Sequence, residues 1–323
     1  MNELARRQLL AKGLVTQSSS AFMALPFASD MQGLDIAIFG VPFDGGTPVR
    51  IGSRHGPRSI RSMSERIHGF HPTYQLSPFA RCRVADVGDV EIPPYDKNAS
   101  LKAIEALGAH LVAADVAPLA LGGDHLISLP ILRSLAPKAP LALVQFDAHC
   151  DTADLSRDGN RYTSATPFRR AIEEGLLDPK HIVQVGLRGT VRSYDKMQWA
   201  LDQGIRQITI DELRDTGLQA TIREVRSIIG DRLTYVTFDI DGIDPTCAPG
   251  TGAPVVGGMT SYEALRLLRG LYGARIVGGD VVEVSPPFDL GDMTALLGAT
   301  LAYEILCLIA KARADASAVS LDG

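Results

Sequence analysis

The sequence predicts an α/β fold in which a doubly wound parallel sheet lies between two layers of helices, a three-layer arrangement. Two observations carry this prediction. Short apolar runs alternate along the chain with longer segments of helical periodicity, which is typical of a parallel sheet covered on both faces. The 323 residues contain no internal repeat and no Pro/Gly/Ser-rich linker, so we expect one main domain.

Six apolar runs are expected to form the strands of this sheet. Each is short enough for a strand, and most are followed directly by a segment with helical periodicity. The expected strands are Asp35–Gly40, Val116–Leu121, Leu141–Phe146, Ile182–Leu187, Leu233–Phe238 and Ile276–Val284.

Seven segments have the spacing of apolar residues that an amphipathic helix requires. The expected helices are Gly56–His68, Ala99–Ala114, Ser128–Leu135, Thr166–Glu174, Ala220–Ile229, Ser261–Gly270 and Ala295–Ala312. The pattern indicates an N-terminal arm at residues 1–30, a single domain at residues 31–316 and a C-terminal tail at residues 317–323.

Composition restricts the classes of partner. The formal net charge is −5, whereas nucleic acids and anionic membranes are bound by clustered Lys and Arg. The four cysteines are widely spaced and form no C-x-x-C pair, which favours a reducing cytoplasm over a disulfide framework. No apolar run approaches the roughly 18 to 20 residues that span a bilayer. We therefore expect a cytoplasmic protein with a small-molecule substrate and no nucleic-acid or membrane partner.

Polar residues end three of the apolar runs. The segments are Gly122–His125, Asp147–Asp151 and Asp239–Pro245. In open parallel sheets ligands bind at the carboxyl ends of the strands, so these segments are the candidate site. Taken separately, each has an ordinary structural explanation as a turn or a helix N-cap. Together they favour a shared chemical role.

That role is predicted to be metal binding. Four carboxylates gathered in one cleft repel one another unless cations fill the cleft, and two divalent ions balance them. In Asp147–Asp151 every second side chain points the same way, so Cys150 is turned away from the acidic side chains and is expected to be a small buried residue. Nitrogen and oxygen donors without thiolate favour Mn²⁺, with Ni²⁺ as an alternative. The candidate ligands are His125, Asp147, His149, Asp151, Asp239 and Asp241.

These three segments resemble the metal-binding signatures of the ureohydrolases, the family of arginase, agmatinase, guanidinobutyrase and guanidinopropionase. Further similar segments are Gly40–Gly46, Arg54–Pro57, Ala248–Gly252 and Val282–Asp289. Together with Thr166–Arg170, the last of these looks closer to the bacterial guanidinopropionase and guanidinobutyrase type than to arginase. The resemblance implies an arginase-like fold and an amidinohydrolase that cleaves a C–N bond of a small guanidino compound to give urea and an amine.

The resemblance also implies a role for each ligand. One metal ion would be bound by His125, Asp147, Asp151 and Asp239, and the other by Asp147, His149, Asp239 and Asp241. Asp147 and Asp239 would bridge the two ions, and Asp151 would be catalytic as well as a ligand. Paired divalent ions lower the pKa of bound water, so that hydroxide exists near neutral pH. Glu283 would bind the guanidinium of the substrate as a catalytic and substrate-binding residue.

Ser164 departs from the family pattern. The family usually has a histidine four residues before the equivalent of Phe168, and that histidine is thought to pass a proton to the leaving amine. Such a step is worth about 10²- to 10⁴-fold, and a serine hydroxyl neither gains nor loses a proton near pH 7. Ser164 is thus a candidate catalytic and substrate-binding residue that acts through a water. Three interpretations follow: a slower guanidino-acid hydrolase, a hydrolase retuned to a substituted guanidine or biguanide, or a low-activity metal-binding partner subunit of a hetero-oligomer.

Val255 is a second departure, because many family members outside the arginases have glutamate at this position. A metal-dependent deacetylase of related architecture would need a catalytic His-His pair, which the sequence lacks. The resemblance implies a homo-oligomer, either a trimer or a hexamer, with a hetero-oligomer as the alternative. The particular guanidino compound and the choice between Mn²⁺ and Ni²⁺ are left open by the sequence.

Overall fold

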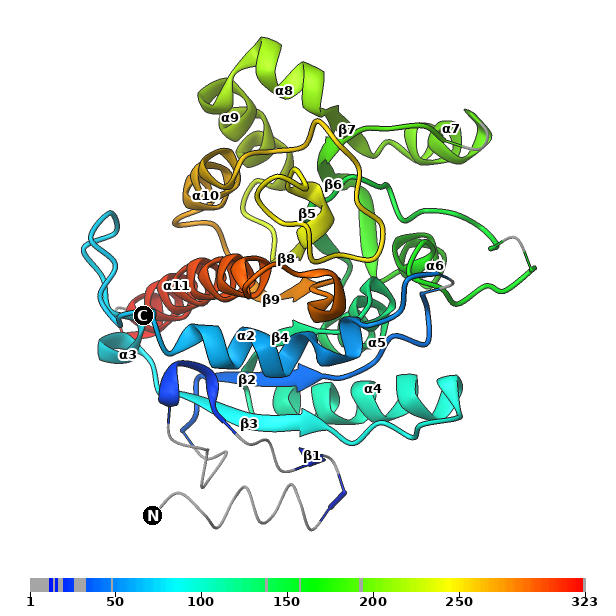
Figure 1. Cartoon of the computed structure of the whole chain (residues 1–323). Coiled ribbons are helices and arrows are strands. Elements are labelled where there is room, and N and C mark those ends of the chain that lie inside the picture. The colour runs from blue at the N-terminus through cyan, green and yellow to red at the C-terminus, as the bar shows by residue number, and fades with distance from the viewer. Residues whose placement is uncertain are drawn as a thin grey trace.

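The computed structural model describes residues 12–13, 15–16, 20–25, 33–47, 49–136, 139–156, 158–191 and 194–321. Within these residues a nine-stranded sheet lies between two layers of helices (Figure 1). The strands are β1 (Val15–Thr16), β2 (Ile36–Val41), β3 (Val84–Val90), β4 (Ala117–Gly122), β5 (Leu141–Phe146), β6 (Leu177–Leu187), β7 (Arg206–Thr209), β8 (Thr234–Asp239) and β9 (Ile276–Val282).

The sheet has the order β1-β3-β2-β4-β9-β8-β5-β6-β7. Neighbouring strands are parallel except for the short β1, which pairs antiparallel with β3 at one edge. Strands β4, β9, β8 and β5 are therefore consecutive in the centre of the sheet. Because parallel strands end at the same edge, the polar segments that follow them are brought together there.

Helices cover both faces of the sheet (Figure 1). Alternate residues of the strands face the two layers: Ile36 and Ile38 belong to one apolar core, and Ala37 and Phe39 belong to the other. The first core is covered by α2 (Gly56–Ser64), α3 (Pro78–Arg81), α8 (Ile210–Thr216), α9 (Leu218–Ile229), α10 (Ser261–Gly270) and α11 (Met293–Leu321). The second is covered by α4 (Lys97–Ala113), α5 (Ser128–Leu135), α6 (Pro167–Glu173) and α7 (Tyr194–Gln203).

Helix α11 is a buried core helix that packs against β9, α2, α3 and α10. Its segment Met293–Ser317 is long and apolar enough to cross a bilayer, and most of the apolar window is buried inside the fold. The expectation that no apolar run approaches this length was therefore wrong. The central helix of a compact α/β protein passes the same length test, because its whole circumference is covered by protein.

A buried ion pair anchors α2 to the edge of the sheet. Arg61 is fully buried, and its Nε and Nη2 donate to the two carboxylate oxygens of Asp86 at 2.7 and 3.0 Å. Asp89 of the same strand also contacts the Arg61 guanidinium. The backbone N–H of Phe22 donates to Asp86 Oδ2 at 2.7 Å, so residues 20–25 pack onto the same ion pair. Most of the arm expected at residues 1–30 lies outside the described residues.

The six expected strands are present. Five of them shift by at most two residues at an end, and β6 begins five residues earlier than expected, at Leu177. Strands β1, β3 and β7 were not expected. In β3 the apolar pattern is interrupted by Asp86, Gly88 and Asp89, while β7 is a short edge strand. The helix expected at Gly56–His68 ends at Ser64, and the last helix continues to Leu321 through part of the expected tail.

Candidate metal centre

The candidate ligands lie on three short segments that follow adjacent or nearly adjacent strands. His125 begins the 3₁₀ turn His125–Ile127 after β4, where the side chain of Asp124 caps the turn by accepting from Leu126 N at 3.0 Å. Asp147 directly follows β5, and Asp239 ends β8. Asp239 caps the next 3₁₀ turn by accepting from Asp241 N at 2.8 Å. These caps direct the side chains out of the carboxyl edge of the sheet.

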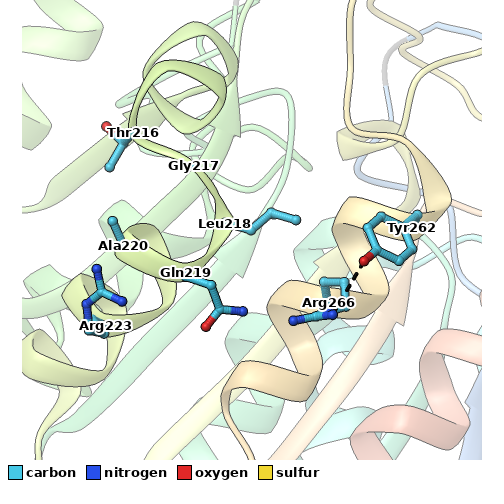
Figure 2. Close-up of a pocket in the computed structure, with 8 residues that line it drawn as sticks. All are labelled: Thr216, Gly217, Leu218, Gln219, Ala220, Arg223, Tyr262 and Arg266. Carbon is cyan, nitrogen blue, oxygen red and sulfur yellow. Dashed lines mark hydrogen bonds between the residues drawn. The ribbon is translucent and has the colours of Figure 1, made fainter.

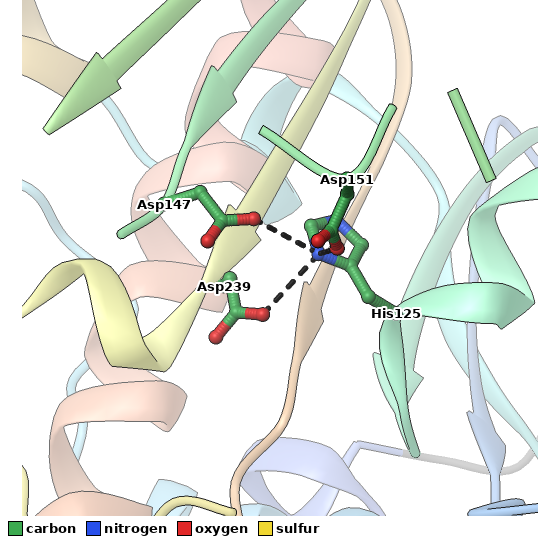
Figure 3. Close-up of side chains that lie close together, drawn as sticks. All are labelled: His125, Asp147, Asp151 and Asp239. Carbon is green, nitrogen blue, oxygen red and sulfur yellow. Dashed lines mark ion pairs between the residues drawn. The ribbon is translucent and has the colours of Figure 1, made fainter. Parts of the chain in front are cut away.

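The first ligand group consists of His125, Asp147, Asp151 and Asp239, all of them buried (Figure 3). His125 Nδ1 lies 3.1 Å from Asp147 Oδ2, 3.0 Å from Asp151 Oδ2 and 3.2 Å from Asp239 Oδ2. One nitrogen and three carboxylate oxygens thus converge on a single buried point. This is the set that the sequence predicted for one of the two metal ions.

The second ligand group consists of Asp147, His149 and Asp241. His149 Nδ1 lies 3.0 Å from Asp241 Oδ2 and 3.6 Å from Asp147 Oδ1. Asp147 therefore joins both groups, as a bridging carboxylate would. Asp239, the other expected bridge, joins only the first group. The His149 side chain is 40% exposed, so this group faces the open side of the site.

The hydrogen bonds around His125 determine which ring nitrogen carries a proton. Thr237 Oγ1 lies 2.8 Å from His125 Nε2 and donates its own hydrogen to Asp280 Oδ1. The other oxygen of Asp280 accepts from Ser128 Oγ at 2.6 Å and Tyr235 OH at 2.8 Å. Thr237 must therefore accept from His125, which places the proton on Nε2. His125 Nδ1 then faces carboxylate oxygens. Although burial lowers it, the pKa of His125 is raised well above its usual range by the carboxylates of Asp147, Asp151 and Asp239.

This arrangement fits a cation. His125 Nδ1 is fully buried and has no hydrogen-bond partner among the described atoms. Three buried carboxylates around one ring nitrogen favour a positive charge between them, which a proton on Nδ1 or a bound metal cation supplies. Burial, together with the charges of Asp241 and Asp147, raises the pKa of Asp239 well above its usual range. Burial and the charge of Asp147 raise the pKa of Asp151 to about 6. A divalent cation would relieve this repulsion by stabilising the charged carboxylates.

Glu283 lies beside the first ligand group, just beyond β9. Its carboxylate accepts from His125 N at 3.0 Å, and its own N–H donates to Gly123 O at 2.8 Å. The backbone has a φ of 63°, a conformation that is uncommon for non-glycine residues. Burial and the charge of Asp124 raise the pKa of Glu283 well above its usual range.

Ser164 lies on a loop that folds over the ligand segments. Its N–H donates to Gly46 O at 3.1 Å, and Gly46 N donates to Asp124 Oδ2 at 2.6 Å. A Cβ on Gly46 would lie within 3.0 Å of both Asp124 Oδ1 and Ser164 N, so only glycine allows this approach. Two hydrogen bonds through Gly46 therefore connect Ser164 to Asp124. Asp124 directly precedes His125.

Several residues that shape the site were not singled out from the sequence. The guanidinium of Arg188 donates to backbone oxygens on two loops around the site, those of Gly186, Asp241, Gly242, Ile243 and Val255. Thr237 and Asp280 orient His125. The sequence signal for these residues was a polar side chain inside an apolar run. Only residues at the ends of such runs were expected to contribute to the site. Cys150, expected to be buried, is half-buried and lies outside both ligand groups.

Two surface cavities lie apart from these ligand groups. One, of about 480 Å³, lies between the start of α9 and α10 and is lined by Leu218, Arg223, Tyr262 and Arg266 among others (Figure 2). Another, of about 580 Å³, lies along the loops that follow β2 and β3. Neither is lined by a candidate metal ligand. The convergence of ligands, and not the size of a cavity, therefore identifies the candidate site.

Residues 34–308 match the model of the arginase family. This chain belongs to the arginase family. All six candidate ligands, Glu283 and Ser164 lie in the matched region. The chain is 50% identical over 293 residues to a guanidinopropionase of Pseudomonas aeruginosa, covering 91% of this chain and 92% of the relative. It is 41% identical to a guanidinobutyrase of the same species, covering 90% and 92%.

Comparison with solved structures also shows the fold of the arginase family. The proclavaminate amidino hydrolase of Streptomyces clavuligerus superimposes with a TM-score of 0.87 at 39% sequence identity. The match covers 93% of this chain and 99% of that one. The three-layer α/β fold predicted from the sequence is therefore confirmed.

Proposed function

We propose that this arginase-family protein hydrolyses a small guanidino acid to urea and an amino acid at a site with two divalent cations. The observation that carries the proposal is the convergence of two ligand groups that share Asp147, with His125 Nδ1 within 3.2 Å of three carboxylate oxygens of the first. A convergence of this kind has no evident structural purpose, because the buried carboxylates repel one another without a cation.

The proposed cation sites use the six predicted ligands. His125, Asp151 and Asp239 would hold one ion, His149 and Asp241 the other, and Asp147 both. Nitrogen and oxygen donors without sulfur support Mn²⁺, with Ni²⁺ as the alternative. When bound, such a pair acidifies a water so that it attacks the guanidino carbon near neutral pH.

The side chains around this pair have separate proposed roles. Glu283 would bind the guanidinium, because a buried carboxylate with two oxygens matches the planar donors of that group. Asp151 would help to hold the attacking water as well as a cation. Ser164 would relay a proton through a water to the leaving amine. The half-exposed His149 lies on the side from which substrate would enter.

The substrate class is proposed from the relatives. Those named guanidinopropionase and guanidinobutyrase match this chain over nearly its whole length, which supports a guanidino group joined to a carboxylate. We further propose one catalytic domain at residues 31–316, an arm at residues 1–30 and a tail at residues 317–323. The described part of the arm, β1 and residues 20–25, packs on this chain's own sheet. A trimeric or hexameric homo-oligomer in the cytoplasm is the proposed assembly, and the four free cysteines agree with that compartment.

The test is a urea-release assay on protein loaded with Mn²⁺ or Ni²⁺, together with metal analysis. Guanidinopropionate, guanidinobutyrate, agmatine, arginine, guanidine and dimethylbiguanide serve as the substrate panel. We expect two metals per chain, turnover of a guanidino acid and loss of activity with a chelator. Turnover of only a substituted guanidine would contradict the proposed substrate class. Bound metal without any turnover would contradict an independently active enzyme.

A further inference from the structure

A row of buried polar side chains crosses the sheet beneath the candidate metal centre. In the strand register, Gln145 of β5 pairs with Gln184 of β6, and Gln184 pairs with Gln207 of β7. On the other side, Gln145 pairs with Thr237 of β8, and Thr237 pairs with Asp280 of β9. Residues paired across neighbouring strands share one face of a sheet. The core of a parallel sheet is normally apolar, so this row requires an explanation.

The three glutamines form a hydrogen-bonded ladder with a single direction. Gln207 Nε2 donates to Gln184 Oε1 at 2.8 Å, and Gln184 Nε2 donates to Gln145 Oε1 at 2.6 Å. Gln145 Nε2 then donates to Asp147 Oδ2 at 2.7 Å. The ladder starts at the edge strand, where Gln207 Oε1 is buried without a partner among the described residues, and ends on the carboxylate that joins both ligand groups.

Backbone carbonyls of the Asp147–Asp151 loop, here called the ligand loop, determine the direction of the hydrogen bonds. The second hydrogen of Gln145 Nε2 is donated to His149 O at 3.2 Å, and Gln184 Nε2 also donates to Cys150 O. Carbonyl oxygens only accept, so each amide must present its NH₂ group to the loop. Two glutamines thus hold consecutive carbonyls of the loop that carries Asp147, His149 and Asp151.

We propose that the Gln145–Gln184–Gln207 ladder is a positioning device for the metal centre. It holds the Asp147–Asp151 loop and the bridging carboxylate in their metal-binding orientation before a cation enters. None of the three glutamines touches substrate or cation; each acts through the next. The inference rests on the proposed function, because it assumes that Asp147 binds metal.

A purely structural role does not explain why the three glutamines make so many hydrogen bonds. Burying amides is unfavourable unless they are hydrogen-bonded, and apolar side chains at Gln145, Gln184 and Gln207 would pack the sheet without that requirement. Both donors of Gln145 and both donors of Gln184 are used, and three of these four bonds end on the ligand loop. The ladder therefore connects the edge strand β7 to the site through bonds that an apolar core cannot make.

The test is Gln184→Met, which keeps the length of the side chain and removes all three of its hydrogen bonds. Mn²⁺ affinity and stoichiometry are measured by titrating the metal-free full chain, and unfolding temperature is measured separately. We expect Mn²⁺ affinity to fall about 10- to 100-fold, the usual effect of removing a partner of a metal ligand. Gln207→Met, which removes only the outermost bond, is expected to weaken affinity by at least about twofold.

The matched control is Tyr74→Phe, which removes a 3.0 Å hydrogen bond to the buried Glu304 in another part of the fold. It is expected to lower the unfolding temperature without changing Mn²⁺ affinity. Unchanged affinity in Gln184→Met with reduced stability overturns this inference alone. If Gln184→Met does not fold, unchanged affinity in Gln207→Met overturns it. An unsubstituted protein that binds no divalent cation overturns the proposed function as well.

Discussion

Thr237→Val is a direct test of whether His125 is held as a metal ligand. Thr237 Oγ1 accepts from His125 Nε2 at 2.8 Å and donates to Asp280, so valine leaves a buried ring N–H and a carboxylate oxygen without partners. An unsatisfied buried donor costs about 1–3 kcal/mol. Loss of such a partner weakens metal binding about 10- to 100-fold, which is about 1.4–2.7 kcal/mol. Valine has nearly the shape of threonine, so little else changes.

The assay is calorimetric titration of metal-free protein with Mn²⁺, accompanied by thermal unfolding. Ser128→Ala is the matched control, because it removes another donor to Asp280, at 2.6 Å, without touching His125. We expect both variants to be less stable and only Thr237→Val to bind Mn²⁺ more weakly. An equal loss of affinity in both variants, or no loss in Thr237→Val, would refute the reasoning.

Three further predictions concern turnover and stability. Ser164→His is expected to raise kcat for a guanidino acid at least about tenfold, because imidazole can protonate the leaving amine; an unchanged rate of urea release would contradict this. Glu283→Gln is expected to lower kcat/KM by about 2 kcal/mol or more, roughly 30-fold, with metal content unchanged by elemental analysis. Arg61→Met leaves the buried Asp86 and the partly exposed Asp89 without their cation, so we expect about 3–5 kcal/mol of destabilisation in denaturant unfolding and unchanged metal stoichiometry.

The candidate ligands were predictable because their spacing is a local property of the chain. In Asp147–Asp151 the spacing of every second residue predicted three side chains on one side. The segment in fact bends at Ala148 and His149, and Asp151 has a φ of 50°, so a turn brings these side chains together. The polar residues also stand at the ends of apolar runs, where the carboxyl edge of a parallel sheet is expected. Both signals can be recognised without knowing the order of the strands in the sheet.

The residues that orient the ligands were not predictable in this way. Gln145 and Thr237 lie inside apolar strands, and nothing local distinguishes them from tolerated polar residues in a core. Their role depends on which strand lies beside which, and on register to a single residue. Strand β3 was missed for a related reason, because the pattern of Asp86 and Asp89 becomes intelligible only when Arg61 packs against them.

The fold class, the family and the chemistry of the metal-binding segments could be predicted from the amino-acid sequence, because periodicity and motif spacing are properties of consecutive residues. The order of strands β4, β9, β8 and β5 became known from the folded structure alone. The same holds for Asp147 joining both ligand groups while Asp239 joins one, and for Nδ1 of His125 facing the carboxylates. The physical reason is that hydrogen bonds and electrostatic repulsion depend on distances of a few ångströms between segments distant in sequence.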